Sequence, residues 1–199
     1  MAKIVGITGP SGSGKSLLSR EIEKLGIPTI DADAVYHDML IPPSRCLDAI
    51  ALAFGEDILS ADGSLDRTVL AAKVFADSEQ LDLLNRTVLP IVIEKINKMI
   101  AAFDASGAHT VVLDAPTLIE SGFYKSCDMV IAVIAPIADR TERIMKRDDL
   151  SEERAAARVA SQRSDEFYTS VADITLFNDQ DEESFRAAAK DVAAAISTL

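Results

Sequence analysis

Eight residues near the start of the chain have the types and spacing of a phosphate-binding loop. They read Gly9-Pro-Ser-Gly-Ser-Gly-Lys15-Ser16 and match the pattern Gly-x-x-x-x-Gly-Lys-Ser/Thr in full. In this pattern small residues let successive backbone N–H groups turn toward one anion, the lysine reaches the β- and γ-phosphates of a nucleotide, and the final hydroxyl is a magnesium ligand. The residues predicted to bind the nucleotide are therefore Gly9, Ser11, Gly12, Ser13, Gly14, Lys15 and Ser16.

The alternative to such a phosphate loop is a glycine-rich turn that binds no ligand. A strand is predicted immediately before the loop and a helix immediately after it, and this context favours phosphate binding. The loop does not separate a kinase from an ATPase, a GTPase or a nucleotide-dependent switch, because these proteins differ in what stands opposite the γ-phosphate. Other groups in the chain must decide between them.

Acidic residues follow two of the predicted strands, where a parallel sheet forms its sites. Asp33 has the place expected of a carboxylate that orients an acceptor hydroxyl and takes its proton, and Asp31 is predicted to share its face on the same extended segment. The alternative is that Asp31-Ala-Asp33 caps a helix beginning near Ala34. Asp114 ends another apolar run and is predicted to hold Mg²⁺ directly or through water, although an exposed strand-end carboxylate would have the same pattern.

Seven of the twenty basic residues lie close together in a chain that is otherwise acidic. They are Arg140, Arg143, Lys146, Arg147, Arg154, Arg158 and Arg163. Arg140, Arg143 and Arg147 share one helix face, at i, i+3 and i+7. Guanidinium groups bind phosphate oxygens in pairs of hydrogen bonds, so the group predicts a helical lid over about residues 138–164 that closes on a transferring phosphoryl group. The alternative is a solvated face whose arginines pair with neighbouring acidic residues.

The elements that must position these groups alternate along the chain. Short β-branched apolar runs predict strands at residues 3–8, 28–30, 110–114, 129–134 and 174–177. Helical patterns predict helices at residues 15–25 and 182–196 and a mostly helical block over about residues 46–105. The alternation predicts an α/β protein of the P-loop NTPase class, with a doubly wound parallel sheet flanked by helices.

The composition bounds the remaining possibilities. The formal charge of −12, from 20 basic and 32 acidic residues, would repel a nucleic-acid backbone. The longest uninterrupted apolar run, residues 129–135, is far shorter than the roughly 18 to 20 residues of a membrane span. The N-terminus lacks the pattern of a secretory signal, so a cytoplasmic protein is expected, with protein partners left open. Cys46 and Cys127 have no metal-ligand spacing and are predicted to be free thiols.

Taken together, the motifs resemble those of the dephospho-CoA kinase family, in order and spacing, from Ile4 to about Asn178. The segments that carry the resemblance are the phosphate loop, Asp31-Ala-Asp33, Asp62-Gly-Ser-Leu-Asp66-Arg67, Leu84-Asn85, Glu120, Arg143 to Arg147 running into Asp148, Arg158-Val-Ala-Ser-Gln162 and Ala172-Asp-Ile-Thr-Leu-Phe-Asn178. The resemblance implies ATP-dependent phosphorylation of the ribose 3′-hydroxyl of dephospho-CoA, the last step of coenzyme A synthesis. It also implies one domain over residues 1–199 with a helical acceptor-binding region at about residues 40–105.

The motifs and the resemblance together assign roles to particular side chains. The expected catalytic residues are Asp33, Lys15, Arg143 and Arg147. Arg140 and Asn178 are expected to bind ATP, with Asn178 near the adenine. The expected acceptor-binding residues are Asp31, Asp33, Arg67, Asn85 and Glu120, and the expected magnesium ligands are Ser16 and Asp114.

Two departures from the family pattern concern the acceptor. The family commonly has His-Pro where this chain has Leu89-Pro90, and Pro-Leu-Leu where it has Pro116-Thr117-Leu118. The alternatives are another small-molecule kinase, of the nucleoside monophosphate or shikimate type, and a nucleotide-dependent switch. A switch needs no hydroxyl acceptor, so the dependence of ATP consumption on an added acceptor separates these interpretations.

Overall fold

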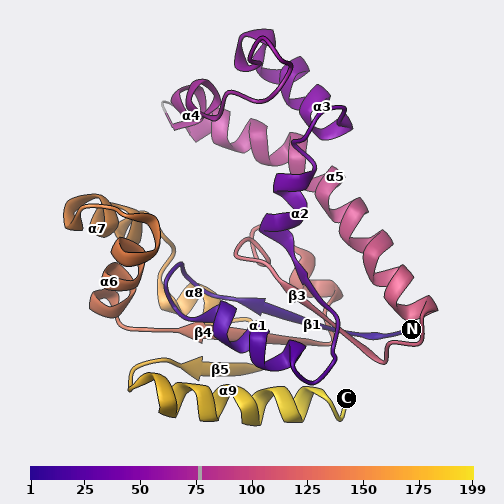
Figure 1. Cartoon of the computed structure of the whole chain (residues 1–199), viewed down its shortest axis with the longest axis vertical. Coiled ribbons are helices and arrows are strands. Elements are labelled where there is room, and N and C mark those ends of the chain that lie inside the picture. Colours follow the sequence, from indigo (N-terminus) through magenta and orange to yellow (C-terminus); the bar gives the residue numbers. More distant parts are fainter. Residues whose placement is uncertain (76–77) are drawn as a thin grey trace. The chain divides into compact units, whose positions relative to one another are not determined.

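The computed structural model describes residues 1–75 and 78–199, which fall into two units. The sheet unit comprises Met1–Asp31 and Ile100–Leu199, and the helical unit comprises Ala32–Met99. Figure 1 shows the elements, which in chain order are β1 (Lys3–Thr8), α1 (Lys15–Glu23), β2 (Thr29–Asp31), α2 (Ala32–Asp38), α3 (Arg45–Phe54), η1 (Glu56–Ile58), α4 (Arg67–Phe75), α5 (Ser78–Ala105), β3 (Thr110–Asp114), η2 (Phe123–Ser126), β4 (Met129–Ile134), α6 (Ile137–Asp148), α7 (Glu152–Ala160), α8 (Asp165–Thr169), β5 (Ile174–Phe177) and α9 (Glu182–Ile196).

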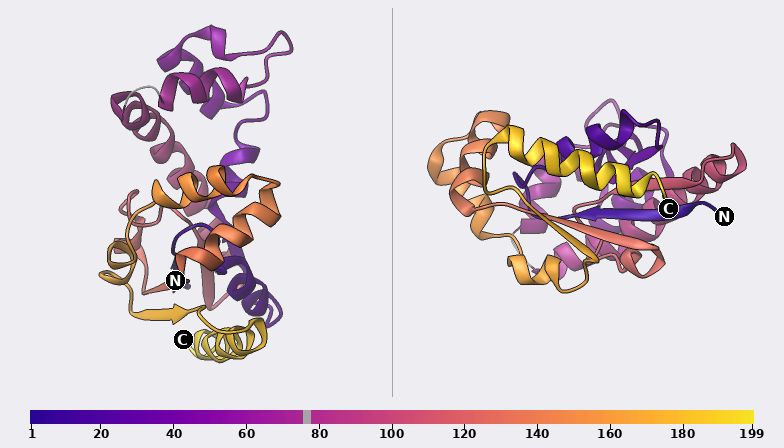
Figure 2. Two further views of the ribbon diagram at one scale, coloured as in Figure 1. Left: turned by 90° about the vertical axis from the view of Figure 1, so that its left-hand side faces the viewer. Right: turned by 90° about the horizontal axis from the view of Figure 1, so that it is seen from below.

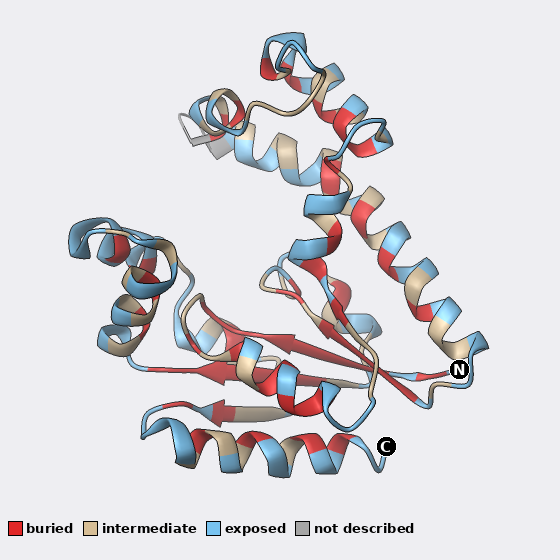
Figure 3. Ribbon diagram, viewed as in Figure 1, coloured by how far each residue is buried: buried red, intermediate tan, exposed pale blue. Residues whose placement is uncertain are grey.

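The sheet unit is built on a parallel sheet whose strands, within the described residues, follow the order β2-β3-β1-β4-β5. Four strands have the predicted bounds, and β2 begins at Thr29, one residue later than predicted. Most residues of β1, β3 and β4 are buried (Figure 3), because helices cover both faces of the sheet. Strands buried on both faces need apolar side chains throughout, so these strands are uninterrupted apolar runs in the sequence. Since β1 lies between β3 and β4, the loop after Thr8 leaves the sheet near the point where the strand order reverses.

Helices pack on both faces of this sheet, as a doubly wound fold requires. Leu18 of α1 and Phe185 of α9 join Ile7 in one apolar core, and Figure 2 shows α9 lying along the sheet. Tyr168 of α8 packs against Ala132 on the other face. The alternation of side chains along each strand separates these two cores.

The mostly helical block predicted over about residues 46–105 is confirmed by α3, η1, α4 and α5, apart from residues 76–77, which lie outside the described residues. Its turns are closed by acidic side chains. Asp62 Oδ1 accepts hydrogen bonds from Ser64 N at 3.0 Å and Ser64 Oγ at 2.6 Å. Asp66 Oδ1 accepts from Thr68 N at 2.9 Å and Val69 N at 3.0 Å, so it caps α4. No helix in the described part of either unit is long and apolar enough to cross a membrane.

In the sheet unit, α6 and α7 form a pair, the α6–α7 hairpin, with an apolar core of its own. Ile144, Ala155 and Val159 are buried there against one another. Asp149, at a φ angle of 51°, ends α6, and Ser151 Oγ accepts a hydrogen bond from Arg154 N to begin α7. The shared core holds the two helices together as one body.

Candidate active site

The phosphate loop, residues 9–16, joins the end of β1 to the first turn of α1. Gly9, Gly12 and Gly14 have φ angles of 138°, 80° and 111°, in the region that favours glycine. At Gly9 there is also no room for a side chain, because a Cβ atom there would lie 2.2 Å from the carbonyl oxygen of Val133. The loop can therefore bend tightly in front of α1, whose N-terminal N–H groups attract an anion.

Lys15 lies against the loop to which it belongs. Its Nζ donates hydrogen bonds to the carbonyl oxygens of Gly9 at 2.8 Å and Pro10 at 3.0 Å. The residue is only 9% exposed. A cation is thus held at the place where the sequence predicts contact with nucleotide phosphates.

Oxygen donors suited to Mg²⁺ gather near the carboxyl ends of β2 and β3. Asp31 and Asp114 are register partners on these strands, and Asp114 Oδ2 accepts a hydrogen bond from Ser19 Oγ at 2.8 Å. Ser19 follows Ser16 by three residues on α1, so the two hydroxyls lie on one side of the helix. Among the described residues, no three His, Cys, Asp or Glu side chains form a metal cluster. Because Mg²⁺ in phosphate-transfer sites takes few protein ligands, the oxygen donors of Ser16 and Asp114 fit this ion.

One face of α6 lies against the phosphate loop. Arg143 Nη1 donates to the carbonyl oxygen of Gly12 at 3.1 Å, and Arg147 Nη2 donates to Ser11 Oγ at 3.3 Å. Arg140, which is 3% exposed, donates from Nε to the carbonyl oxygen of Ser11 at 3.3 Å. The three arginines thus meet the loop rather than forming only a solvated face.

Arg140 differs from the other two arginines in its burial. Its Nη2 donates to Gln162 Oε1 at 2.8 Å, and its Nη1 lies 3.7 Å from Asp165 Oδ1. Burial lowers the pKa of Arg140, while the Asp165 charge acts in the opposite direction. A guanidinium nevertheless stays charged in proteins. Arg140 therefore braces the loop in this structure, and its contact with ATP stays a prediction.

Asn178, which follows β5, also braces the loop. Its Nδ2 donates to the carbonyl oxygen of Ser13 at 2.8 Å, and its Oδ1 accepts from Arg143 Nη2 at 3.3 Å. The residue is buried, and a Cβ atom at Gly14 would lie 2.5 Å from Asn178 Nδ2. Its predicted place near the adenine stays a prediction.

Asp33 lies in a helix, contrary to the prediction of an extended segment. α2 begins at Ala32 rather than near Ala34, so Asp31 ends β2 and Asp33 lies in the first turn of α2. The prediction that Asp31 and Asp33 share one face of a strand is therefore wrong, because the chain changes from strand to helix between them. Both residues are exposed, Asp31 in the sheet unit and Asp33 in the helical unit.

The other predicted acceptor residues also lie at the surface of their units. Arg67 begins α4; burial raises the pKa of Tyr36, and the positive charge of Arg67 only partly opposes this rise. Asn85 is an exposed residue of α5. In the sheet unit, burial raises the pKa of Tyr168, and the negative charge of exposed Glu120 raises it further. The assignment of these residues to an acceptor stays a prediction.

Comparison with known proteins identifies the family. A family model described as dephospho-CoA kinase matches residues 3–183. The chain belongs to the dephospho-CoA kinase family. It is accordingly a transferase of coenzyme A biosynthesis that uses ATP as its phosphoryl donor.

Curated relatives of this kinase support the assignment. The dephospho-CoA kinase of Corynebacterium efficiens is 38% identical over 194 residues, covering 98% of this chain and 97% of the relative. The dephospho-CoA kinase of Mycobacterium tuberculosis strain H37Rv is 39% identical over 188 residues, covering 94% of this chain and 46% of the relative. The kinase thus spans about half the length of the mycobacterial protein and nearly all of the corynebacterial one.

Solved structures confirm the predicted fold of the kinase. A Thermus thermophilus crystal structure matches with a TM-score of 0.81 and 31% identity, covering 98% of each chain. The dephospho-CoA kinase from Campylobacter jejuni matches with a TM-score of 0.73 and 28% identity, covering 100% of this chain and 98% of that one. A shikimate kinase from Acinetobacter baumannii, at a TM-score of 0.53 and 20% identity over 100% of this chain and 92% of that one, shares the fold alone.

Sequence reasoning gave no role in the kinase to Ser19, Gln162 or Asp148, yet each bonds to a predicted site residue. Asp148 accepts from Arg147 Nε at 2.7 Å and from Arg158 Nη1 at 2.7 Å. The hydrogen bond from Arg147 holds the pKa of Asp148 below its ordinary value. For Ser19 the i+3 spacing from Ser16 indicated a shared helix face. Asp148 was predicted only as one of the acidic residues that could pair with the arginines of a solvated face, and the sequence gave no sign of the partners of Gln162.

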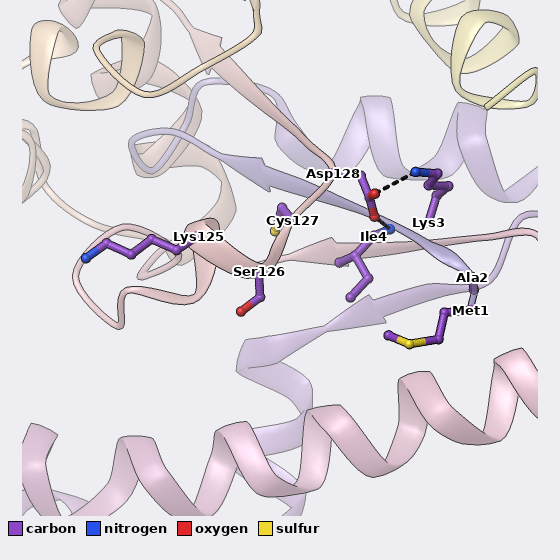
Figure 4. Close-up of a pocket in the computed structure, with 8 residues that line it drawn as sticks. All are labelled: Met1, Ala2, Lys3, Ile4, Lys125, Ser126, Cys127 and Asp128. Atoms are coloured by element: carbon purple, nitrogen blue, oxygen red, sulfur yellow. Dashed lines mark hydrogen bonds and ion pairs between the residues drawn. The ribbon is translucent and has the colours of Figure 1, made fainter.

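A pocket of about 320 Å³ lies at the opposite end of the strands from the phosphate loop in this kinase. Its lining residues are Met1, Ala2, Lys3, Ile4, Lys125, Ser126, Cys127 and Asp128. Figure 4 shows the Lys3–Asp128 ion pair beside it, at 2.8 Å. Burial raises the pKa of Cys127 to about 12, so this residue is a neutral thiol at pH 7. Because the pocket lies at the amino ends of β1 and β4, it is separate from the phosphate loop.

Proposed function

We propose that this kinase transfers the γ-phosphoryl group of ATP to the ribose 3′-hydroxyl of dephospho-coenzyme A, giving coenzyme A and ADP in the last step of coenzyme A synthesis. The contact of Arg143 and Arg147 with the phosphate loop carries the proposal. A kinase must neutralise charge on the transferring phosphoryl group, and guanidiniums beside the loop can do so. The family match and the printed names of the relatives support the choice of acceptor.

The donor side of the proposal uses the phosphate loop and α6. Backbone N–H groups of the loop and the Lys15 ammonium bind the β- and γ-phosphates. Arg143 and Arg147 bind the same anion from the α6–α7 hairpin, which is the body of the proposed lid over residues 138–164. Ser16 and Asp114 would hold Mg²⁺, which supplies further positive charge to the phosphate oxygens.

The acceptor side assigns the proton to Asp33. The 3′-oxygen forms a bond to the γ-phosphorus while the bond from that phosphorus to the β–γ bridging oxygen breaks, and ADP leaves. The hydroxyl proton passes to the Asp33 carboxylate, which also orients the hydroxyl. The acceptor-binding region is proposed to lie at about residues 40–105, and the binding residues are proposed to be Asp31, Arg67, Asn85 and Glu120.

The test is ADP formation by the purified protein with ATP and magnesium. Dephospho-CoA, AMP, shikimate and pantetheine phosphate are offered separately, beside a reaction without acceptor. We expect ADP to form only with dephospho-CoA, and mass spectrometry of the product to show one added phosphoryl group. ADP formation with another acceptor alone would reject the proposed acceptor, and formation independent of any acceptor would favour a switch.

Removing one arginine of α6 tests the role of the hairpin. Arg147→Ala is expected to lower kcat by on the order of 100-fold, the usual effect of losing one donor that stabilises transition-state charge. The free energy of unfolding should change little, because the Arg147 side chain is 55% exposed and its ion pair with Asp148 lies at the surface. Steady-state kinetics and thermal unfolding measure the two effects.

Lys146→Ala is the matched control for this variant. Lys146 is the preceding residue of α6, but its Nζ pairs with Glu142 rather than with the phosphate loop. Its kcat should equal that of the unaltered protein. If kcat is unchanged for Arg147→Ala as well, Arg147 has no catalytic role and belongs to a solvated face.

A further inference from the structure

The α6–α7 hairpin and the residues just after it engage one residue of the phosphate loop through three separate groups. Ser11 N donates to Gln162 Oε1 at 2.8 Å. Ser11 Oγ accepts from Arg147 Nη2, and its carbonyl oxygen accepts from Arg140 Nε, both at 3.3 Å. Ser11 thus ties the loop to the hairpin together with Gly12, whose carbonyl oxygen accepts from Arg143.

Gln162 makes the shortest of these contacts, and both the oxygen and the nitrogen of its carboxamide form hydrogen bonds. Oε1 accepts from Ser11 N and from Arg140 Nη2, each at 2.8 Å. Nε2 donates to the carbonyl oxygen of Arg158, in the last turn of α7, at 3.1 Å. One side chain therefore joins the phosphate loop, α6 and α7.

The position of Arg140 depends strongly on this oxygen atom. Arg140 is nearly fully buried, so a guanidinium N–H that lost its acceptor could not turn to water without disturbing its surroundings. The backbone of α6 also touches the loop here, because a Cβ atom at Gly12 would lie 2.8 Å from the carbonyl oxygen of Arg140. Arg143 and Arg147 belong to the same helix and face, so a shift of Arg140 would move them as well.

We propose that Gln162 is a positioning residue for phosphoryl transfer: its carboxamide oxygen sets the place of the α6 arginines relative to the phosphate loop. Gln162 itself acts through Ser11 and Arg140 and needs no contact with the substrate. The proposal rests on the proposed function, in which Arg143 and Arg147 bind the phosphates of ATP. Small misplacements of such groups lower kcat more than they weaken ground-state binding.

Gln162→Met tests the proposal, because methionine keeps the length and approximate volume of the side chain but removes the amide. We expect kcat with dephospho-CoA to fall about 10- to 100-fold. The dissociation constant for ATP, measured by calorimetry without acceptor, should change far less than kcat, since the loop N–H groups and Lys15 remain. Packing alone would instead leave kcat unchanged at temperatures below the unfolding transition.

Two further variants make the test specific. Gln162→Glu keeps an acceptor oxygen at the same reach for Ser11 N and Arg140, so its kcat is expected to exceed that of Gln162→Met. Ser161→Ala is the matched control, because Ser161 Oγ bonds to the same Arg158 carbonyl oxygen, at 2.9 Å, without contacting the loop; its kcat should be unchanged.

The possible failures can be told apart. If the unaltered protein does not phosphorylate dephospho-CoA, the proposed function fails before Gln162 is tested. If the unaltered protein is active and Gln162→Met retains its kcat, the positioning role is rejected. A Gln162→Glu variant no more active than Gln162→Met would also reject it, because the carboxamide oxygen would not be the atom that matters.

Discussion

Lys15→Ala is expected to abolish measurable phosphoryl transfer, with a loss in kcat of at least about 100- to 1,000-fold. The ammonium group is held at the phosphate loop by the carbonyl oxygens of Gly9 and Pro10. In the proposed reaction it binds the β- and γ-phosphates, whose charge shifts toward the leaving ADP as the bond breaks. ADP formation with dephospho-CoA, followed at saturating ATP, measures the loss.

Because Lys15 is buried, a second variant must separate catalysis from folding. Lys15→Met keeps most of the side-chain stem and removes the charge. It should therefore fold and should lose as much activity as Lys15→Ala; thermal unfolding checks that it folds. Lys24→Ala is the control, since Lys24 lies just beyond α1 and pairs with Glu21 at 2.8 Å, away from the loop. Transfer by either Lys15 variant at a rate near that of the Lys24 control would rule out the assigned role.

Asp33→Asn is expected to lower kcat by about 100- to 10,000-fold, the usual contribution of a positioned general base. The amide has nearly the same shape as the carboxylate but cannot take the proton of the acceptor hydroxyl. ATP binding should be little affected, because the phosphate loop is unaltered. Turnover kinetics and calorimetry with ATP measure the two effects.

The neighbouring aspartates provide the comparison for Asp33. Asp38→Asn alters an exposed carboxylate at the other end of α2 and should keep full activity. Asp31→Asn is the informative rival, because Asp31 ends β2 beside Asp114. Full activity of Asp33→Asn together with a large loss in Asp31→Asn would transfer the role of base to Asp31.

The sequence alone predicted the phosphate loop and the sheet around it. The glycines of residues 9–16 have positive φ angles, and a Cβ atom at any of them would also lie too close to distant segments, so glycine is the residue that fits these positions. Strands such as β1 and β4 are buried on both faces, and burial requires the apolar runs by which they were predicted. Each requirement restricts the residue type at the position itself, which is why a sequence shows it although distant segments impose it.

The strand-to-helix change after Asp31 was placed incorrectly from the sequence. The run Asp31-Ala-Asp33 is compatible both with an extended segment and with a helix start, because aspartate is common near helix N-termini. In the structure Asp31 is the last residue of β2 and pairs in register with Asp114, the last residue of β3. The next residue, Ala32, begins α2. Pairing with another strand, which a local pattern does not contain, decided the boundary.

What only the tertiary structure decided is which partner each polar side chain meets. Helical spacing placed Arg140, Arg143 and Arg147 on one face, but the packing of α6 against the phosphate loop buried the first and left the last 55% exposed. Gln162 reaches Ser11 across 151 positions of sequence, and Asn178 reaches Ser13 across 165. Periodicity determines which residues of an element share a face. Which other element this face meets depends on how distant segments pack. The chemistry of the phosphate loop was therefore predictable from the sequence, whereas the hydrogen bonds that hold the loop in place were not.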